Sequence, residues 1–501
     1  MPVALTVQSP QGVRRGDLAP AAMAAAGVLA LHVILSGRYG FHGDELVTLS
    51  AARHPALGYL DRAPAVPLLA RGIGFVFGDG LWPLRVAAGV VHTGLVAATA
   101  YLAWRFGGRR QALALAAIAA ALLPVFLAEG SLFRAPVLDE LWWGLALVLV
   151  VRLVDGADPR EWLALGLVLG LGLETRWTIL ALAAAIAVGF AAVPEGRRHL
   201  ATRWPWLGGA LALALWLPNL AWQAAHGWPA LDVYREVTGD ARADGGPLGP
   251  LVRQLVAAGP GALVIAVAGG VWLARRRRWR VPAAVALAAV AVSVAAGLPA
   301  GTLGPLYVLL LAAGAVAFDG WIGVDADRWR QVMTFLVLAA LVAVPATTPL
   351  LAPRDYATLF HDVDADVGEE VGWQGMVHLV AGVRDVLPAD ELGELRVVTA
   401  SAGAAAALDR YGPARGIPPG TALSGEGAYA GFWPDGQPAG TVLFVGFGRR
   451  ELARYCRVVG PLAIVGNDAA VPNRLLGAHI AFCGRLLVTP GQLRAGLTRV
   501  R

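Results

Sequence analysis

Two adjacent carboxylates, Asp44 and Glu45, follow a long apolar run that begins near Pro20. Charged side chains are costly in lipid, so acids at the edge of a membrane span are expected to have a function. A third acid and a cation, Asp61 and Arg62, follow in a short stretch that contains two prolines. A carboxylate can remove a proton from an attacking group, and an arginine can bind a phosphate bidentately. The four side chains therefore predict proton transfer and phosphate binding in one loop, although Asp44 and Glu45 also fit a simpler role in the first turn of a helix.

Three more charged residues lie where one apolar run ends and the next begins. Arg134 precedes Asp139 at the start of one run, and Arg176 lies in a short turn between two others. We predict that these three residues, with Asp61 and Arg62, bind a phosphate or another part of a substrate. A helix N-terminal acid is an equal alternative for Asp139. For Arg176 the alternative is a side chain that reaches from the span to the water interface.

The composition places these residues in a membrane protein. Of the 501 residues, 57% are hydrophobic and 15% are charged, whereas globular domains have about 25% charged residues. The net charge of +6 does not indicate nucleic-acid binding, because the arginines cluster in short segments between apolar runs. That arrangement is typical of cytoplasmic loops. We therefore predict a multi-span α-helical protein of the plasma membrane that binds no nucleic acid.

Eleven apolar runs are long enough, or nearly so, to cross a bilayer. They lie near residues 20–37, 83–104, 111–128, 135–153, 161–174, 177–193, 206–222, 251–273, 281–298, 302–318 and 331–350. With the N-terminus in the cytoplasm, the arginines of 197–203 and 275–280 also fall on the cytoplasmic side, in agreement with the positive-inside rule. The same topology places all the candidate residues named above at the extracytoplasmic face.

From Arg354 onward charges become frequent and the apolar runs shorten to the length of strands. We predict strands at 396–400 and 440–446, followed by helices at 403–411 and 449–456. The chain therefore divides into a transmembrane domain of residues 1–352 and a small extracytoplasmic α/β domain of residues 353–501.

The two cysteines of the chain, Cys456 and Cys483, both belong to this C-terminal part. Outside the cell, paired thiols persist as disulfides. Free cysteine is also among the most frequently buried residue types. A disulfide and two buried thiols are therefore equal alternatives at this point.

The loop after the first span resembles that of a known family. In the GT-C membrane glycosyltransferases of the protein mannosyltransferase and aminoarabinose transferase group (ArnT-like, glycosyltransferase family 39), an Asp-Glu pair precedes a segment similar to Tyr-Phe-Glu-Lys-Pro-Pro. Here Tyr59-Leu60-Asp61-Arg62-Ala63-Pro64 is similar to that segment, and Ala63 replaces the first proline. The turn at 173–178 and the segment at 216–229 also resemble parts of these transferases.

The resemblance implies a GT-C fold and a glycosyltransferase activity. Asp44 takes the place of the family's catalytic base, with Glu45 as its neighbour. In the segment similar to Tyr-Phe-Glu-Lys-Pro-Pro, Asp61 takes the position of the acidic residue and Arg62 that of the basic residue. The expected reaction is inverting transfer of a hexose or pentose from a polyprenyl-phosphate donor to a protein, lipid or cell-envelope glycan. A divalent metal, Mg²⁺ or Mn²⁺, held by Asp44 and Asp139 is permitted but not required, since such ions accept one or two carboxylates with substrate phosphate.

A polytopic transporter or flippase of a lipid-linked or envelope substrate is the alternative function. Transporters of this kind often contain internal repeats with broken helices in corresponding positions. The sequence shows no such repeat, and we therefore favour the transferase.

Overall fold

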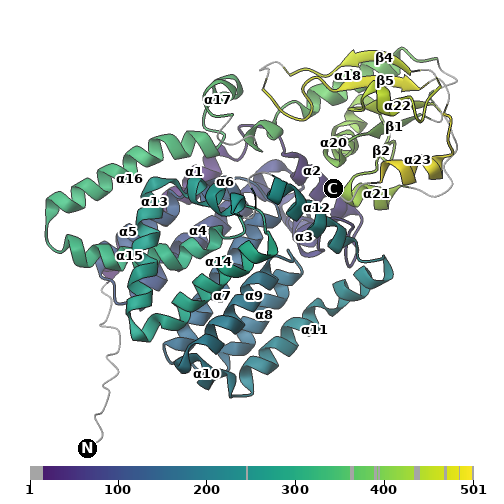
Figure 1. Cartoon of the computed structure of the whole chain (residues 1–501). Coiled ribbons are helices and arrows are strands. Elements are labelled where there is room, and N and C mark those ends of the chain that lie inside the picture. The colour runs from purple at the N-terminus through teal and green to yellow at the C-terminus, as the bar shows by residue number, and fades with distance from the viewer. Residues whose placement is uncertain are drawn as a thin grey trace, which may run out of the picture.

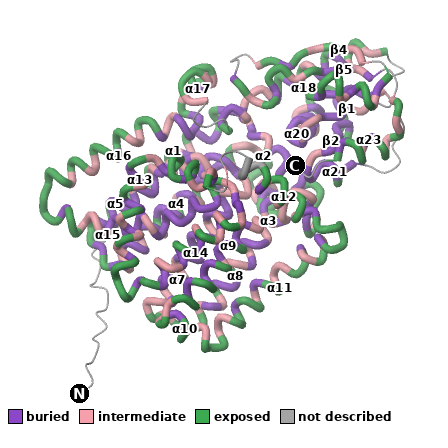
Figure 2. The backbone as a smooth tube through the Cα atoms, viewed as in Figure 1, coloured by how far each residue is buried: buried purple, intermediate pink, exposed green. Residues whose placement is uncertain are grey.

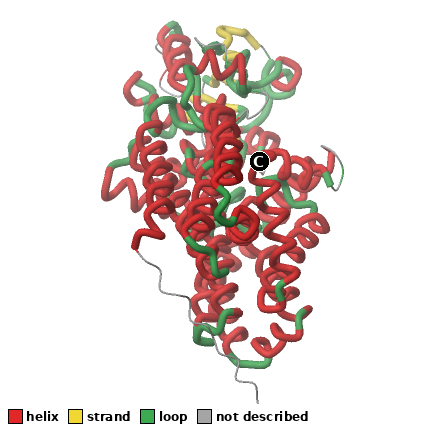
Figure 3. The backbone as a smooth tube through the Cα atoms, turned by 90° about the vertical axis from the view of Figure 1, so that its left-hand side faces the viewer, coloured by secondary structure: helices red, strands yellow, loops and turns green. Residues whose placement is uncertain are grey.

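The computed structural model describes residues 15–243, 246, 248–361, 366–388, 392, 395–433, 441–457, 459–467, 471–483 and 486–498. A large body of helices carries a small sheet domain at one end (Figure 1). Figure 3 shows the same division from the side, with the strands confined to one end of an elongated molecule.

The helical body contains all the predicted apolar runs as helices. Its elements are α1 (Arg15–Leu35), α4 (Leu81–Arg105), α5 (Arg110–Ala121), α6 (Pro124–Gly130), α7 (Ala135–Val154), α8 (Glu161–Leu173), α9 (Ile179–Ala192), α10 (Pro194–Leu200), α11 (Trp204–Ala225), α12 (Pro229–Ala243), α13 (Gly249–Arg275), α14 (Arg280–Ala296), α15 (Tyr307–Ile322) and α16 (Ala326–Thr347). Within the described residues, six helices are long and apolar enough to cross a membrane, or up to eight if each of two bent pairs is one span. The multi-span prediction is confirmed, and the count of eleven is not.

The centre of this body is built from close contacts between small residues. A Cβ added to Gly314 of α15 would lie 1.9 Å from the carbonyl oxygen of Ile265 in α13, and one added to Gly208 of α11 would lie 2.3 Å from that of Trp162 in α8. Glycine at such points lets two helix backbones approach closely, which is how helices associate in membranes. Figure 2 shows the buried centre and the more exposed outer helices α11 and α16.

The first loop contains two short helices, α2 (Gly43–Arg53) and α3 (Ala65–Phe77). A capping box starts α2: the His42 imidazole accepts a hydrogen bond from the Asp44 amide at 3.1 Å, and the Glu45 carboxylate accepts one from the His42 amide at 2.9 Å. Both predicted acids therefore lie in the first helical turn, where carboxylates also interact favourably with the helix dipole.

The C-terminal part begins with α17 (Pro353–Leu359) and α18 (Trp373–Asp385) and contains one five-stranded sheet. Its other elements are β1 (Arg396–Thr399), α20 (Ala402–Tyr411), β2 (Ala422–Ser424), α21 (Gly427–Phe432), β3 (Val442–Val445), α22 (Arg449–Leu452), β4 (Val459–Ile464), β5 (His479–Cys483) and α23 (Pro490–Leu497). The strand order is β2-β1-β3-β5-β4. Strands β2, β1 and β3 are parallel, with Val398 opposite Leu423 and Phe444, and β5 runs antiparallel to β3 and β4.

The predicted α/β character of this part is confirmed. Each of β1 and β3 lies within a predicted strand and is followed by a helix, although α22 ends four residues before Cys456. Gly440, the first residue of the second predicted strand, lies outside the described residues. A disulfide joins Cys456 to Cys483, with the two Cα atoms 5.6 Å apart, which decides between the two alternatives left by the sequence.

The first loop and the sheet domain share one apolar core. Leu46 and Val47 of α2 belong to the same buried cluster as Trp373 of α18 and Ala405 of α20. Because this cluster contains residues from both sides of the predicted boundary at residue 352, the division into two domains stays a prediction. The packing has a clear consequence for the site, since it holds the first loop against the sheet domain.

Candidate active site

A polar cavity of about 290 Å³ lies between the first loop, the start of α7 and the sheet domain. Its charged lining residues are Asp44, Asp61, Arg62, Arg134, Asp366, Glu369, Glu426 and Arg474. Four of them were predicted from the sequence, and the structure brings those four together. The other four lie in the C-terminal part, which forms the opposite wall.

Asp44 is the most accessible of the predicted acids in this cavity, with 55% of its side chain exposed. Desolvation of the Asp44 carboxyl acts to raise its pKa. The charges of His42, Arg62 and Arg134 outweigh that effect and hold the pKa below its ordinary value. An opposite charge nearby favours the ionised form of a carboxyl. Asp44 therefore lines the cavity as an ionised carboxylate, the form that can accept a proton.

Glu45 occupies a different environment although it is the next residue. Its carboxylate is fully buried and accepts hydrogen bonds from the Arg85 guanidinium at 3.0 and 3.3 Å and from the Phe133 amide at 3.0 Å. Arg85 of α4 also contacts Glu370 at 2.8 Å. This buried group of three charges connects the first loop, the helical body and the C-terminal part, and it fixes the helix that carries Asp44.

Arg134 forms the side of the cavity near α7. Its guanidinium binds Glu129 at 3.1 Å and Asp366 at 2.7 Å. The charge of Arg134 is the main cause that holds the pKa of Asp366 below its ordinary value. Because Asp366 belongs to the C-terminal part, this ion pair closes the cavity between two segments that are 232 residues apart in sequence.

Asp61 and Arg62 form a bidentate ion pair. The Asp61 carboxylate accepts hydrogen bonds from Nη2 of Arg62 at 2.7 Å and from its Nε at 3.1 Å, and Nη1 donates to the Thr48 hydroxyl at 3.3 Å. Both residues line the polar cavity and also a second, larger cavity of about 560 Å³. The pair therefore stands where the two cavities meet.

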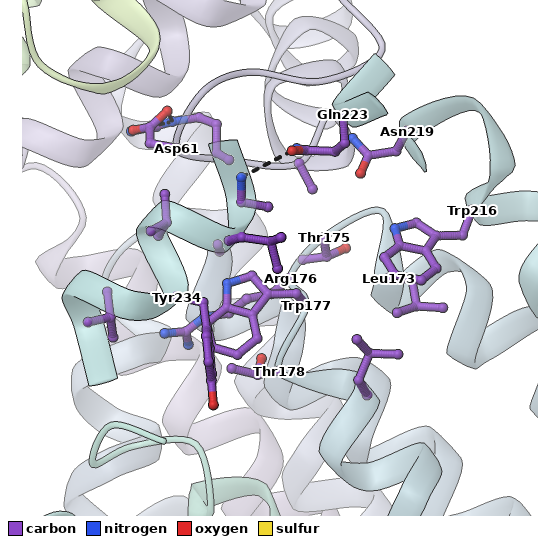
Figure 4. Close-up of a pocket in the computed structure, with 18 of the residues that line it drawn as sticks. Asp61, Leu173, Thr175, Arg176, Trp177, Thr178, Trp216, Asn219, Gln223 and Tyr234 are labelled. Atoms are coloured by element: carbon purple, nitrogen blue, oxygen red, sulfur yellow. Dashed lines mark hydrogen bonds and ion pairs between the residues drawn. The ribbon is translucent and has the colours of Figure 1, made fainter. Parts of the chain in front are cut away.

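The larger cavity is mainly apolar and lies among α8, α9, α11, α12 and α14. Figure 4 shows the aromatic side chains of Trp177, Trp216 and Tyr234 around it, with Arg176 among them. The segment at 216–229, which the sequence singled out without a role, forms one wall. Gln223 in that segment accepts a hydrogen bond from the Ala230 amide at 3.1 Å.

Arg176 is held at this cavity by Asp139. The Arg176 guanidinium lies 3.9 Å from the Asp139 carboxylate, which also accepts a 2.7 Å hydrogen bond from the Thr178 hydroxyl. Asp139 is itself buried in α7. The structure thus places Asp139 behind Arg176, whereas Asp44 lies in the polar cavity.

Within the described part of the chain, no group of three or more histidine, cysteine or acidic residues could hold a metal ion. Asp44 and Asp139, the pair that permitted a metal, contact different partners: His42 for the former, Thr178 and Arg176 for the latter. In the described structure Asp44 and Asp139 thus do not share a partner.

The sequence reasoning missed Asp366, Glu369, Glu426 and Arg474. Glu426 comes just before α21, and its carboxylate accepts a hydrogen bond from the Ala402 amide at 2.6 Å. Burial, with the nearby negative charges of Asp61 and Asp44, raises the pKa of Glu426. These residues follow no motif or spacing, because they reach the cavity through the fold of a separate part of the chain.

Residues 61–222 match the family model of dolichyl-phosphate-mannose-protein mannosyltransferase. The comparison with curated proteins found no match. Among solved structures, ArnT from Cupriavidus metallidurans bound to undecaprenyl phosphate superposes with a TM-score of 0.60 at 14% identity, over 93% of this chain and 98% of that one.

A second similar structure is the archaeal oligosaccharyltransferase AglB from Archaeoglobus fulgidus, in complex with an inhibitory peptide and a dolichol-phosphate. It superposes with a TM-score of 0.52 at 14% identity, over 86% of this chain and 69% of that one. At such identities the likeness shows a shared fold.

Proposed function

The chain has the GT-C fold of the ArnT-like glycosyltransferases, as its first loop predicted, and we propose that it transfers a sugar from a polyprenyl-phosphate donor to an acceptor at the extracytoplasmic face of the membrane. The acceptor is a protein, a lipid or a cell-envelope glycan.

One observation carries this proposal: an apolar cavity and a polar cavity meet at the Asp61–Arg62 pair. A polyprenyl-phosphate sugar has the same division, with an apolar chain, a phosphate and a polar sugar in that order. The apolar cavity fits part of the prenyl chain, and the polar cavity fits the sugar and the acceptor group. The phosphate then lies at the junction.

Arg62 and Arg176 are the cations assigned to this phosphate. Both line the apolar cavity, and arginine binds phosphate bidentately while remaining charged. Asp139 acts behind Arg176 as a positioning residue, because it contacts the guanidinium from within α7. That ArnT was solved with undecaprenyl phosphate supports a carrier of this class here.

Asp44 is the general base of the proposed reaction. Its carboxylate takes the proton of the acceptor hydroxyl while the acceptor oxygen forms a bond to the anomeric carbon of the sugar. The bond from that carbon to the phosphate oxygen breaks, and the polyprenyl phosphate leaves with the electron pair, stabilised by the two arginines. Attack from the side opposite the leaving phosphate inverts the anomeric centre, so we assign an inverting hexosyl or pentosyl transfer.

Glu45 is assigned a positioning role in this scheme. It is completely buried and pairs with Arg85, so it supports the helix that carries Asp44 and has no open space for a substrate. The sequence had grouped the two acids together as catalytic.

The sidedness of the proposal rests on the cysteines and on the arginine pattern. A disulfide in the sheet domain is typical of an oxidising compartment. The positive-inside rule supports an extracytoplasmic first loop, and the sheet domain packs against that loop. A plasma-membrane protein with an extracytoplasmic C-terminal domain satisfies both.

The test is the variant Asp44→Asn in the full-length purified protein, assayed with a polyprenyl-phosphate sugar. The amide keeps the shape of the side chain and removes the base, so we expect turnover to fall by about 10²- to 10⁴-fold with no change in the melting temperature. Asp327→Asn is the matched control, since Asp327 is 72% exposed in the first turn of α16. Full activity of Asp44→Asn would overturn the assignment of the base.

A further inference from the structure

The ion pair at the junction of the two cavities is already complete without a substrate. Asp61 and Arg62 have 16% and 19% of their side chains exposed, and the carboxylate occupies Nε and Nη2 of the guanidinium. The remaining nitrogen, Nη1, donates to the Thr48 hydroxyl. The Nε–Nη2 edge of the guanidinium is thus occupied by Asp61, and Nη1 has a partner in Thr48.

The sheet domain keeps Asp61 in this position. A Cβ added to Gly427, the first residue of α21, would lie only 2.5 Å from Oδ2 of Asp61. The backbone at Gly427 therefore packs directly against the carboxylate. The Asp61 carboxylate therefore has no room to move toward Gly427.

A phosphate that enters from the apolar cavity can use the Nε–Nη2 edge of Arg62 only in place of the Asp61 carboxylate. Planar bidentate binding by arginine is the same for carboxylate and phosphate oxygens, so one edge cannot hold both. The donor phosphate therefore competes with the Asp61 carboxylate for the bidentate Nε–Nη2 edge and for the positive charge of Arg62.

We propose that Asp61 is a positioning residue that competes with the phosphate for Arg62: it holds the guanidinium in the resting enzyme and takes it back as the polyprenyl phosphate product leaves. This inference rests on the proposed function, because it concerns the phosphate of that donor and product. The sequence analysis predicted that Asp61 binds the substrate. In this proposal Asp61 instead competes with the phosphate of the substrate.

The chemistry of the product explains why such a competitor is useful. The donor is a phosphodiester with one negative charge, whereas a phosphate monoester carries about 1.5 to 2 negative charges near pH 7. The product therefore binds Arg62 more strongly than the donor does. A carboxylate that returns to the guanidinium offsets this difference and speeds release of the product.

The direct test measures binding of undecaprenyl phosphate to the purified full-length protein by the fluorescence of the tryptophans that line the apolar cavity, Trp177, Trp216 and Trp228. We expect Asp61→Asn to tighten binding about tenfold, which equals about 1.4 kcal/mol. Undecaprenol, which has the same chain and no phosphate, should bind the variant and the wild type equally. In turnover, Asp61→Asn should lower kcat and make product release rate-limiting, with an unchanged first turnover.

Two controls separate competition from other effects. The tightening should vanish in the double variant Asp61→Asn/Arg62→Gln, because the competed group is then absent. Asp79→Asn removes another aspartate that pairs with arginines, Arg53 and Arg410, outside both cavities, and should leave binding unchanged. Asp61→Ser is the second variant if Asp61→Asn does not fold, since it removes the same charge with a smaller side chain.

The outcomes are distinct. Unchanged or weaker binding of undecaprenyl phosphate by folded Asp61→Asn or Asp61→Ser overturns the competition, as does tightening that also appears with undecaprenol. A wild-type protein that binds undecaprenol and undecaprenyl phosphate equally overturns the phosphate site itself, and with it the proposed function.

Discussion

Replacing Arg85 by methionine should destabilise the protein more than replacing an exposed residue, because Arg85 joins the helical body to the C-terminal part. Arg85 has 1% of its side chain exposed and pairs with Glu45 at 3.0 Å and with Glu370 at 2.8 Å. It also donates to the Gly40 carbonyl at 2.8 Å. Methionine keeps much of the volume and removes the charge, so two buried carboxylates lose their cation.

The magnitude follows from what remains around each carboxylate. Removing one partner of a buried ion pair costs roughly 3–5 kcal/mol, because the other charge stays in the interior without compensation. Glu45 retains hydrogen bonds from the His42 and Phe133 amides, which lowers its share of the cost. We therefore expect about 3 kcal/mol for Arg85→Met, and partial recovery when Glu45→Gln and Glu370→Gln are added.

The assay is thermal unfolding of the purified protein in one detergent, with the transfer reaction measured on the same samples. Arg71→Met is the matched control, since Arg71 is exposed on α3 and makes a single 3.1 Å hydrogen bond to the Ala52 carbonyl. Arg85→Met should lower the melting temperature clearly and reduce activity with it. A melting temperature equal to that of Arg71→Met would refute the reasoning, and so would a triple variant less stable than Arg85→Met alone.

Glu45→Gln tests the separate roles of the two neighbouring acids. It should reduce the melting temperature and leave the acid limb of the pH–rate profile in place. Loss of turnover without loss of stability would make Glu45 catalytic. Replacing Cys456 and Cys483 by serine opens a bridge that closes 27 residues, and chain entropy predicts a cost of about 3.5 kcal/mol, measurable as a lower melting temperature than that of the oxidised wild type. Glu426 has a raised pKa, so its negative charge is lost as the pH falls through a value above the ordinary 4.5. Glu426→Gln should therefore remove an inflection in the pH profile of kcat/KM in that range. A pH profile identical to that of the wild type would contradict the place of Glu426 in the polar cavity.

The sequence by itself determined the features that depend on neighbouring residues. Apolar runs became helices because a backbone in lipid must satisfy its hydrogen bonds internally. The short β-branched runs after Arg354 became β1 and β3 for a similarly local reason. The first loop could also be recognised, since its acids and its arginine lie within about twenty residues and form a motif. The exact number of spans could not, because six to eight helices meet the length and hydropathy that crossing requires.

Only the tertiary structure decided which charges form the site. Asp44 and Glu45 are adjacent, so successive side chains on their helix point about 100° apart, and the position of Arg85 in α4 determines which of them is buried. Asp366 and Glu426 enter the cavity from segments more than 200 residues away. No local pattern reports such contacts, because periodicity reflects what a residue's own helix or strand faces and not which distant segment packs against it.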